Sequence, residues 1–88
     1  MEITIEWTEE DIDHIRKHNI EPKEVESIFE SKIYYRRNKG FYNFYGRAKS
    51  GRILLVITKK VDNKYRVITA RDATPSEKAL YVKRAKGI

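Results

Sequence analysis

A strand, a short turn and a helix are predicted in direct succession by Arg66-Val67-Ile68-Thr69-Ala70-Arg71-Asp72-Ala73-Thr74-Pro75-Ser76-Glu77-Lys78-Ala79-Leu80-Tyr81. The β-branched run that ends at Thr69 favours a strand. Thr74 fits a helix N-cap, Pro75 the first helical position and Glu77 the third, which is the pattern of a capping box. The strand is therefore expected to end at Arg71, and the helix to begin at Pro75.

The rest of the chain predicts an α+β domain. Changes of hydrophobic period and turn residues predict strands at 3–6, 33–37, 41–49, 52–60 and 64–71, and helices at 8–19, from 22, and at 75–86. The unbroken apolar run 53–57 is typical of a strand covered on both faces, so we place it centrally. The predicted order is β-α-α-β-β-β-β-α, with a mostly antiparallel sheet packed by helices.

Length and composition favour one small domain. The 88 residues suffice for a single core over residues 1–88. The absence of cysteine excludes disulfides and thiolate metal sites and fits a reducing compartment. Neither a basic segment followed by an apolar run nor a long apolar stretch is present, so we expect no signal peptide, no membrane span and a cytoplasmic location.

Charge is divided along the chain. Residues 1–31 carry ten acids and three bases, a balance of −7, whereas residues 32–88 carry sixteen bases and three acids, a balance of +13. A basic surface of this size favours a polyanion such as nucleic acid. The alternative is that the charges serve solubility alone.

Four arginines lie on the three successive strands predicted between residues 41 and 71: Arg47, Arg52, Arg66 and Arg71. If these strands form a meander, the four side chains can converge on one face or rim. Converging guanidinium groups bind phosphodiesters and stabilise the charge that builds on phosphorus during cleavage. The alternative is a set of independent surface arginines.

The strand–helix junction is expected to bring Arg71, Glu77 and Tyr81 near one another. Glu77 suits both a capping box and a general base, and Tyr81 suits core packing as well as an acid or orienting role. His18 follows the first predicted helix, where it suits either a C-terminal cap or a general base. His14 is expected to face solvent, and with no third ligand the two histidines indicate no metal site.

Aromatic residues are concentrated in the first predicted hairpin. Six fall within twelve positions, namely Tyr34, Tyr35, Phe41, Tyr42, Phe44 and Tyr45. They are interleaved with Arg36 and Arg37. Aromatic rings with nearby cations form stacking platforms for unpaired bases, although alternate rings must enter the core. We therefore expect half of the rings on each face, and count Arg36, Arg37 and Tyr45 among candidate RNA-binding residues.

The chain resembles the BrnT family of toxins along most of its length. The resemblance rests on 5–7 (Ile-Glu-Trp), 16–19 (Arg-Lys-His-Asn), the Pro-Xaa-Glu-Val helix start at 22–25, 45–47 (Tyr-Gly-Arg), 51–54 (Gly-Arg-Ile-Leu), 66–71 (Arg-Val-Ile-Thr-Ala-Arg), and the residues from 73 to 81. Asn19 stands where the family usually has glycine, and both residues tolerate the same backbone conformation.

The resemblance implies a RelE-like fold and a metal-independent ribonuclease, with no cofactor, that arrests growth by cutting RNA. It also implies a cognate antitoxin, usually of the ribbon-helix-helix type, with a toxin homodimer or a toxin–antitoxin heterotetramer as expected assemblies. In this hypothesis Arg71 and Arg52 stabilise the reacting phosphorus, Arg47 and Lys49 hold flanking phosphates, and Arg66 is a further RNA-binding candidate. The alternative is a non-catalytic module of the same fold that binds RNA or protein.

Overall fold

The computed structural model describes residues 3–85 and confirms the predicted order of elements. The elements are β1 (Ile5–Glu6), α1 (Glu9–Arg16), α2 (Pro22–Ser27), the 3₁₀ helix η1 (Ile28–Glu30), β2 (Tyr34–Asn38), β3 (Phe41–Arg47), β4 (Ile53–Val61), β5 (Lys64–Asp72) and α3 (Pro75–Ala85). The expected last residue of α3, Lys86, lies outside the described residues. Within 3–85, no helix has both the length and the apolar character needed to cross a membrane.

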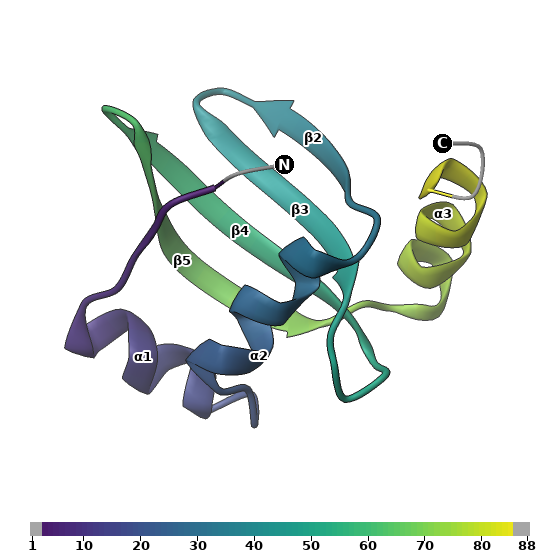
Figure 1. The fold of residues 1–88 in the computed structure, drawn as a ribbon, viewed down its shortest axis with the longest axis horizontal. Helices are drawn as coiled ribbons and strands as arrows, with labels where there is room; N and C mark the ends of the chain where they lie inside the picture. The colour runs from purple at the N-terminus through teal and green to yellow at the C-terminus, as the bar shows by residue number, and fades with distance from the viewer. Residues whose placement is uncertain (1–2, 86–88) are drawn as a thin grey trace.

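The strands form a single five-stranded sheet in the order β1-β5-β4-β3-β2 (Figure 1). β4 is central, as its apolar run predicts, and β2 to β5 form an antiparallel meander. β1 is shorter than expected and pairs in parallel with β5 through Ile5 and Glu6. The prediction of a mostly antiparallel α+β domain is therefore confirmed.

The start of α1 and the turn after it follow from local chemistry. Thr8 caps the helix by accepting a hydrogen bond from the Asp11 backbone, and three acidic residues occupy the first turn, where the helix dipole favours negative charge. After the helix, Asn19 adopts a left-handed conformation with a φ of 60°, which asparagine tolerates better than most residues. Ile20 follows and is fully buried.

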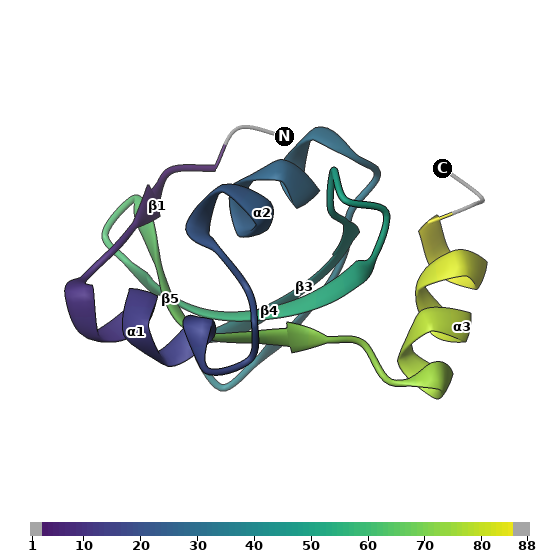
Figure 2. The same ribbon diagram turned by 90° about the horizontal axis from the view of Figure 1, so that it is seen from below.

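The two faces of the sheet pack differently (Figure 2). One face, here called the α2 face, carries the main core against α1, α2 and η1, and includes Phe44, Leu54, Val56, Val67 and Ala70. The opposite face, called the α3 face, carries a smaller cluster of Tyr45, Ile53, Leu55, Ala73, Tyr81 and Ala85. Since α3 lies at one end of this face, most of the strand surface beyond it carries no helix from residues 3–85 (Figure 2).

The helix α3 begins as its sequence predicts. The Glu77 carboxylate accepts a hydrogen bond from the Thr74 backbone at 2.8 Å, and the Glu77 backbone donates to the Thr74 hydroxyl at 3.3 Å, which completes the capping box. Tyr81 and Ala85 are the buried residues of this helix. The neighbouring Leu80 is only half-buried.

A β-bulge lies between β4 and β5. Ile57 pairs with Thr69 and Thr58 pairs with Val67, so Ile68 has no partner across the strand. An extra residue of this kind shifts the alternation of side chains along a strand. As a result, Thr69 and Arg71 point to the α3 face, whereas Val67 and Ala70 enter the main core.

Candidate functional site

The α3 face is built from three rows of side chains that run across the sheet. The strand register defines row 1 as Tyr34, Tyr45, Leu55 and Arg71, row 2 as Arg36, Asn43, Ile57 and Thr69, and row 3 as Asn38, Phe41, Lys59 and Arg66. Row 1 lies against α3, and rows 2 and 3 follow at increasing distance from it. Neighbouring rows are about 6.6 Å apart, because alternate residues of a strand share one face.

These rows form a basic surface that becomes more exposed away from α3. Row 1 is buried or half-buried, whereas three members of row 3 are exposed. The rows carry the cations Arg36, Lys59, Arg66 and Arg71. Arg66 and Arg71 pair with Asp11 and Glu77 of the helices, whereas Arg36 and Lys59 form no ion pair within residues 3–85. A surface of this composition suits a polyanionic ligand.

Arg71 is fixed at the end of row 1 by Glu77. Arg71 Nη1 and Nη2 donate to the two Glu77 carboxylate oxygens at 2.7 and 3.0 Å, and Nη1 also donates to the Asp72 carbonyl. This bidentate pairing orients the guanidinium plane. The hydrogen bonds from Arg71 hold the pKa of Glu77 below its ordinary value, and the same contact raises the pKa of Arg71. Both groups are therefore charged near neutral pH.

Tyr45 lies in row 1, the row that also contains Arg71. Its side chain is only 5% exposed, and its hydroxyl bonds to none of the described residues. Burial raises the pKa of Tyr45, the Glu77 carboxylate raises it further, and the Arg36 and Arg71 cations act in the opposite direction. The phenol is therefore neutral near pH 7 and is a hydrogen-bond donor without an acceptor among residues 3–85.

Tyr81 does not occupy this position. Its hydroxyl donates to the Lys32 carbonyl at 2.6 Å, and its ring packs in the α3 cluster. Of the two roles predicted for Tyr81, the structure confirms core packing, because the ring is buried and the hydroxyl is directed to the backbone before β2 and not to Arg71. The phenol whose pKa responds to those two charges is that of Tyr45.

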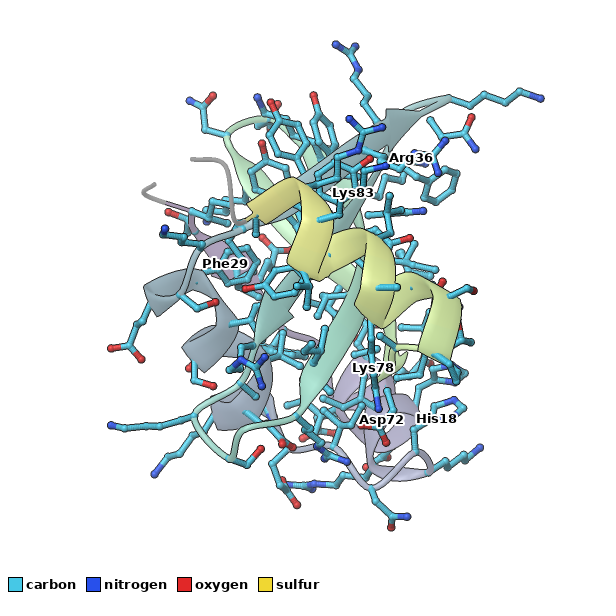
Figure 3. All side chains as sticks on the ribbon, turned by 90° about the vertical axis from the view of Figure 1, so that its right-hand side faces the viewer. His18, Phe29, Arg36, Asp72, Lys78 and Lys83 are labelled. Atoms are coloured by element: carbon cyan, nitrogen blue, oxygen red, sulfur yellow. The ribbon has the colours of Figure 1, made fainter. Side chains whose placement is uncertain are left out.

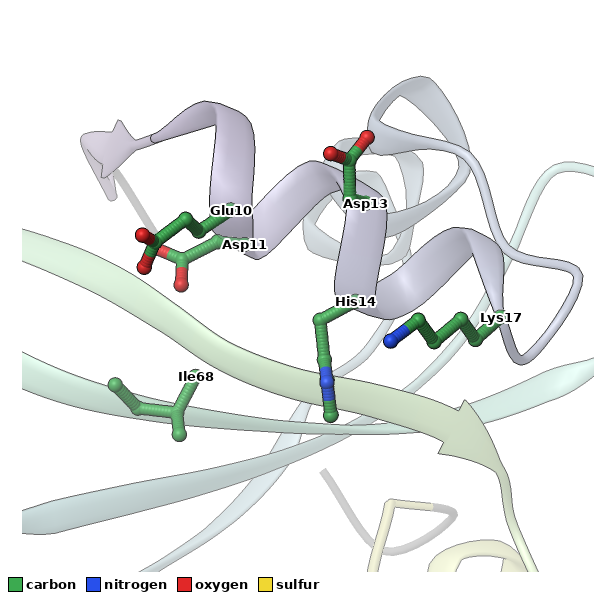
Figure 4. Close-up of a pocket in the computed structure, with 6 residues that line it drawn as sticks. All are labelled: Glu10, Asp11, Asp13, His14, Lys17 and Ile68. Carbon is green, nitrogen blue, oxygen red and sulfur yellow. The ribbon is translucent and has the colours of Figure 1, made fainter.

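The two histidines of the first helical segment lie at the β5 edge. His14 Nε2 is 3.1 Å from Thr69 Oγ1, and the His14 and His18 rings meet edge to face at 5.6 Å. Figure 4 shows the His14 side chain reaching from α1 toward β5. Because Thr69 and Arg71 share the α3 face, His14 borders the same surface as Arg71. His14 is exposed as expected, but it also contacts the sheet.

Arg36 and Arg37 lie on opposite faces of β2. Arg36 belongs to row 2, whereas the Arg37 guanidinium lies 5.7 Å from the centre of the Tyr42 ring on the α2 face. In Figure 3, Phe29 lies on the α2 side of the sheet, and Arg36 and His18 lie on the other side. The six aromatic residues of the hairpin divide equally, as expected, with Tyr34, Phe41 and Tyr45 on the α3 face.

Arg52 joins three segments on the α2 side and is not part of the Arg71 cluster. Its guanidinium binds both carboxylate oxygens of Glu24 and the Asn19 carbonyl, and lies 3.3 Å from the Asp72 carboxylate. Hydrogen bonding to Arg52 lowers the pKa of Glu24. The expected convergence of four arginines on one face is therefore wrong, because Arg52 binds α2 and the turn that precedes it.

Arg66 and Arg47 lie at the margins of the α3 face. Arg66 pairs with Asp11 of α1 at 2.9 Å, and Asp11 is 7% exposed. Arg47 donates to the Gly51 carbonyl and borders a hollow beside Tyr81, at the far end of α3 from Arg71. Lys49 lies in the turn after β3, where its backbone donates to Ser27.

Ion pairs join the acidic segment, residues 1–31, to the basic segment, residues 32–88. Glu24 binds Arg52, Asp11 binds Arg66 and Glu6 lies 4.0 Å from Lys64. These pairings were not predicted, since the partners are far apart in the chain. One signal was present, because residues 11, 14, 15 and 18 share one helical face and Ile15 is a core residue. That spacing places Asp11, His14 and His18 toward the sheet.

Comparison with known proteins yields a structural match. No protein-family model matches the chain, and no curated protein matches its sequence. The crystal structure of the Brucella abortus ribonuclease toxin, BrnT, matches with a TM-score of 0.63 over 83% of this chain and 99% of that chain. The two proteins share one fold. At 23% sequence identity, this likeness confirms the α+β fold expected from the resemblance to BrnT toxins.

Proposed function

We propose that the chain is the toxin of a toxin–antitoxin pair and arrests growth as a metal-independent endoribonuclease. The observation that carries the proposal is Arg71, which Glu77 orients at the end of row 1, two strands from Tyr45, on a sheet face that carries four cations. The fold likeness to a BrnT ribonuclease toxin supports the same activity.

In the proposed reaction, the ribose 2′-oxygen attacks the adjacent phosphorus and the bond from phosphorus to the 5′-oxygen breaks. The products are a 2′,3′-cyclic phosphate and a 5′-hydroxyl. A base accepts the proton of the 2′-hydroxyl, and an acid returns one proton to the leaving 5′-oxygen. Arg71 stabilises the negative charge that develops on the phosphoryl oxygens, so this role falls to a guanidinium group rather than a metal ion.

Glu77 is better suited to positioning than to proton transfer. A carboxylate whose pKa is lowered by Arg71 is a weak base, whereas histidine exchanges protons near neutral pH. We assign the base to His14, which borders the Arg71 surface through Thr69, with His18 packed against it. Tyr45 remains protonated and donates a hydrogen bond to the phosphate or the leaving oxygen.

The test is cleavage of purified RNA together with growth arrest. Arg71→Ala is expected to lower the cleavage rate about 100- to 1000-fold, the usual loss when one donor to a developing charge is removed. Glu77→Gln is expected to lower it less, because the amide still accepts one hydrogen bond from Arg71. If both variants cut RNA and arrest growth like the parent, the assigned site is wrong.

Arg36 and Arg37 provide a matched control, since they are adjacent in sequence and lie on opposite faces of β2. Arg36→Ala is expected to weaken RNA binding and to reduce its dependence on salt by about one phosphate contact. Arg37→Ala is expected to leave both unchanged. Equal losses from the two variants would show that RNA does not bind the α3 face.

For the partner, we propose a cognate antitoxin of the ribbon-helix-helix type that acts in the cytoplasm, as the resemblance to BrnT toxins implies. The toxin pairs either with itself or in a heterotetramer with antitoxin. Co-expression with the product of the neighbouring reading frame, followed by copurification and a growth assay, tests this. A neighbouring frame whose product neither binds the chain nor restores growth would contradict it.

A second candidate function is RNA binding without cleavage. It is favoured by the contacts of Arg71, because both of its terminal nitrogens already bind Glu77 and a phosphate must share or displace that carboxylate. In the same assay, a binding module would retain RNA on the α3 face and leave its length unchanged. Production of 5′-hydroxyl ends by the parent protein would exclude this candidate.

A further inference from the structure

Two side chains in rows 2 and 3 are not used by the proposed cleavage chemistry. Phe41 is 39% exposed, and its ring contacts no other aromatic ring among residues 3–85. Asn43 is half-buried, and its amide makes no hydrogen bond to the described part of the chain. Each therefore presents an interacting group to solvent on the α3 face.

These features differ from those of comparable residues on the same hairpin. Tyr35 is 48% exposed, but its ring lies 5.7 Å from Phe44 and 6.2 Å from Tyr42, on the α2 face. Tyr34 lies 5.7 Å from Tyr45, with the two rings stacked. Within residues 3–85, Phe41 has neither a ring partner nor a helix over it, so packing among the described residues does not account for its exposed position.

The neighbours of Asn43 favour a ligand that pairs with both the donor and the acceptor of its amide. Directly across the strands lie Arg36 and Ile57, and along β3 on the same face lie Phe41 and Tyr45. A polar group among apolar and aromatic neighbours gains most from a ligand that satisfies both its donor and its acceptor. The edge of a nucleobase carries such complementary groups, and asparagine recognises them through two hydrogen bonds.

We propose that Phe41 and Asn43 form a base-reading site for single-stranded RNA. The ring of Phe41 stacks on one unpaired nucleobase, and the Asn43 amide hydrogen-bonds the edge of that base or its neighbour. Lys59 lies across from Phe41 and Arg36 across from Asn43, so cations flank the site on both sides for the phosphates. This inference rests on the proposed function and specifies its substrate.

Geometry separates base reading from cleavage. Asn43 lies two strands and one row from Arg71, a Cα separation of about 12 Å. Phe41 lies two strands and two rows from Arg71, at about 16 Å. The base that is read is therefore not at the scissile phosphate but further along the strand. Duplex RNA is excluded from the site, because a paired and stacked base offers neither its face to Phe41 nor its pairing edge to Asn43.

The test uses a randomised pool of 2′-O-methyl RNA, which cannot be cut through its 2′-oxygen. Bound strands are selected on the parent protein and sequenced, and one base is expected to be enriched at one position. Asn43→Leu is expected to abolish the enrichment, and Asn43→Asp, which keeps the side-chain shape, is expected to change the preferred base. Asn63→Leu, in the exposed turn between β4 and β5 and outside the three rows, is the control and is expected to retain the parent's preference.

The stacking contact has its own matched pair. Phe41→Ala is expected to weaken binding of a selected strand about 5- to 100-fold, the usual effect of losing one base–aromatic stack. Tyr35→Ala, an exposed ring on the opposite face, is expected to leave binding within about twofold. Each of three results would overturn the inference. They are no enrichment on the parent, unchanged enrichment with Asn43→Leu and Asn43→Asp, and equal losses of binding from Phe41→Ala and Tyr35→Ala. The readout is binding alone, so a parent that enriches a base without cutting RNA would contradict the proposed function and leave the base-reading site intact.

Discussion

The ion pair between Glu24 and Arg52 is expected to stabilise the fold without taking part in catalysis. Arg52 donates to both carboxylate oxygens of Glu24, which also accepts a 2.6 Å hydrogen bond from Ser50. The side chains of Arg52 and Glu24 are 29% and 15% exposed. Removing one partner of a fully buried pair costs about 3–5 kcal/mol. Since Arg52 is partly solvated and keeps two other acceptors, we expect Glu24→Ala to lower the free energy of unfolding by about 2–3 kcal/mol.

For a domain of this size, that loss corresponds to a fall in Tm of roughly 8 to 24 °C. Glu21→Ala is the matched control, because Glu21 pairs with Arg16 at the surface, where the side chains are 63% and 55% exposed. We expect a cost of no more than about 1 kcal/mol there. Thermal unfolding followed by circular dichroism measures both variants.

RNA cleavage by Glu24→Ala is measured below its Tm. We expect the parent's rate, because Arg52 lies on the α2 side of the sheet and not beside Arg71. Equal Tm values for the Glu24 and Glu21 variants would refute the structural role. A hundredfold loss of RNA cleavage with the fold intact would show that Arg52 belongs to the catalytic site.

Three further predictions concern stability. Gly46→Ala places a β-carbon 2.8 Å from an isoleucine methyl carbon, so we expect the free energy of unfolding in urea to fall by about 1–3 kcal/mol. An unchanged urea midpoint would show that the contact relaxes freely. Tyr81→Phe removes the 2.6 Å hydrogen bond to the carbonyl of residue 32, so we expect the free energy of unfolding to fall by about 1–2 kcal/mol and RNA cleavage to stay normal. Loss of cleavage in the folded variant would show that Tyr81 is catalytic. Ion pairing lowers the pKa values of Glu24 and Glu77 from 4.5, so their stabilisation is complete above pH 4.5 and is lost as pH falls through the lowered values. The Glu24→Gln variant is expected to show a smaller loss of Tm between pH 5 and pH 3 than the parent, and an identical loss would contradict the assignment.

The sequence by itself determined the local structure of this protein. The capping box at Thr74 and Glu77, the left-handed Asn19 and the central position of β4 all follow from residue types and short spacings. The equal division of the hairpin aromatics also follows, since alternation along a strand is a local property. The order of the elements was predictable for the same reason.

Only the tertiary structure decided which charged and phenolic groups meet. The pairing of Arg71 with Glu77 was predicted from the strand–helix junction, whereas Arg52 binds Glu24 of α2, far from it in sequence. Tyr81 enters the core, and Tyr45 lies two strands from Arg71 in the same row because of the register of β3, β4 and β5. Such contacts depend on strand register, on the bulge at Ile68 and on where each helix docks. These features arise from packing between segments distant in sequence, so no local pattern predicts them.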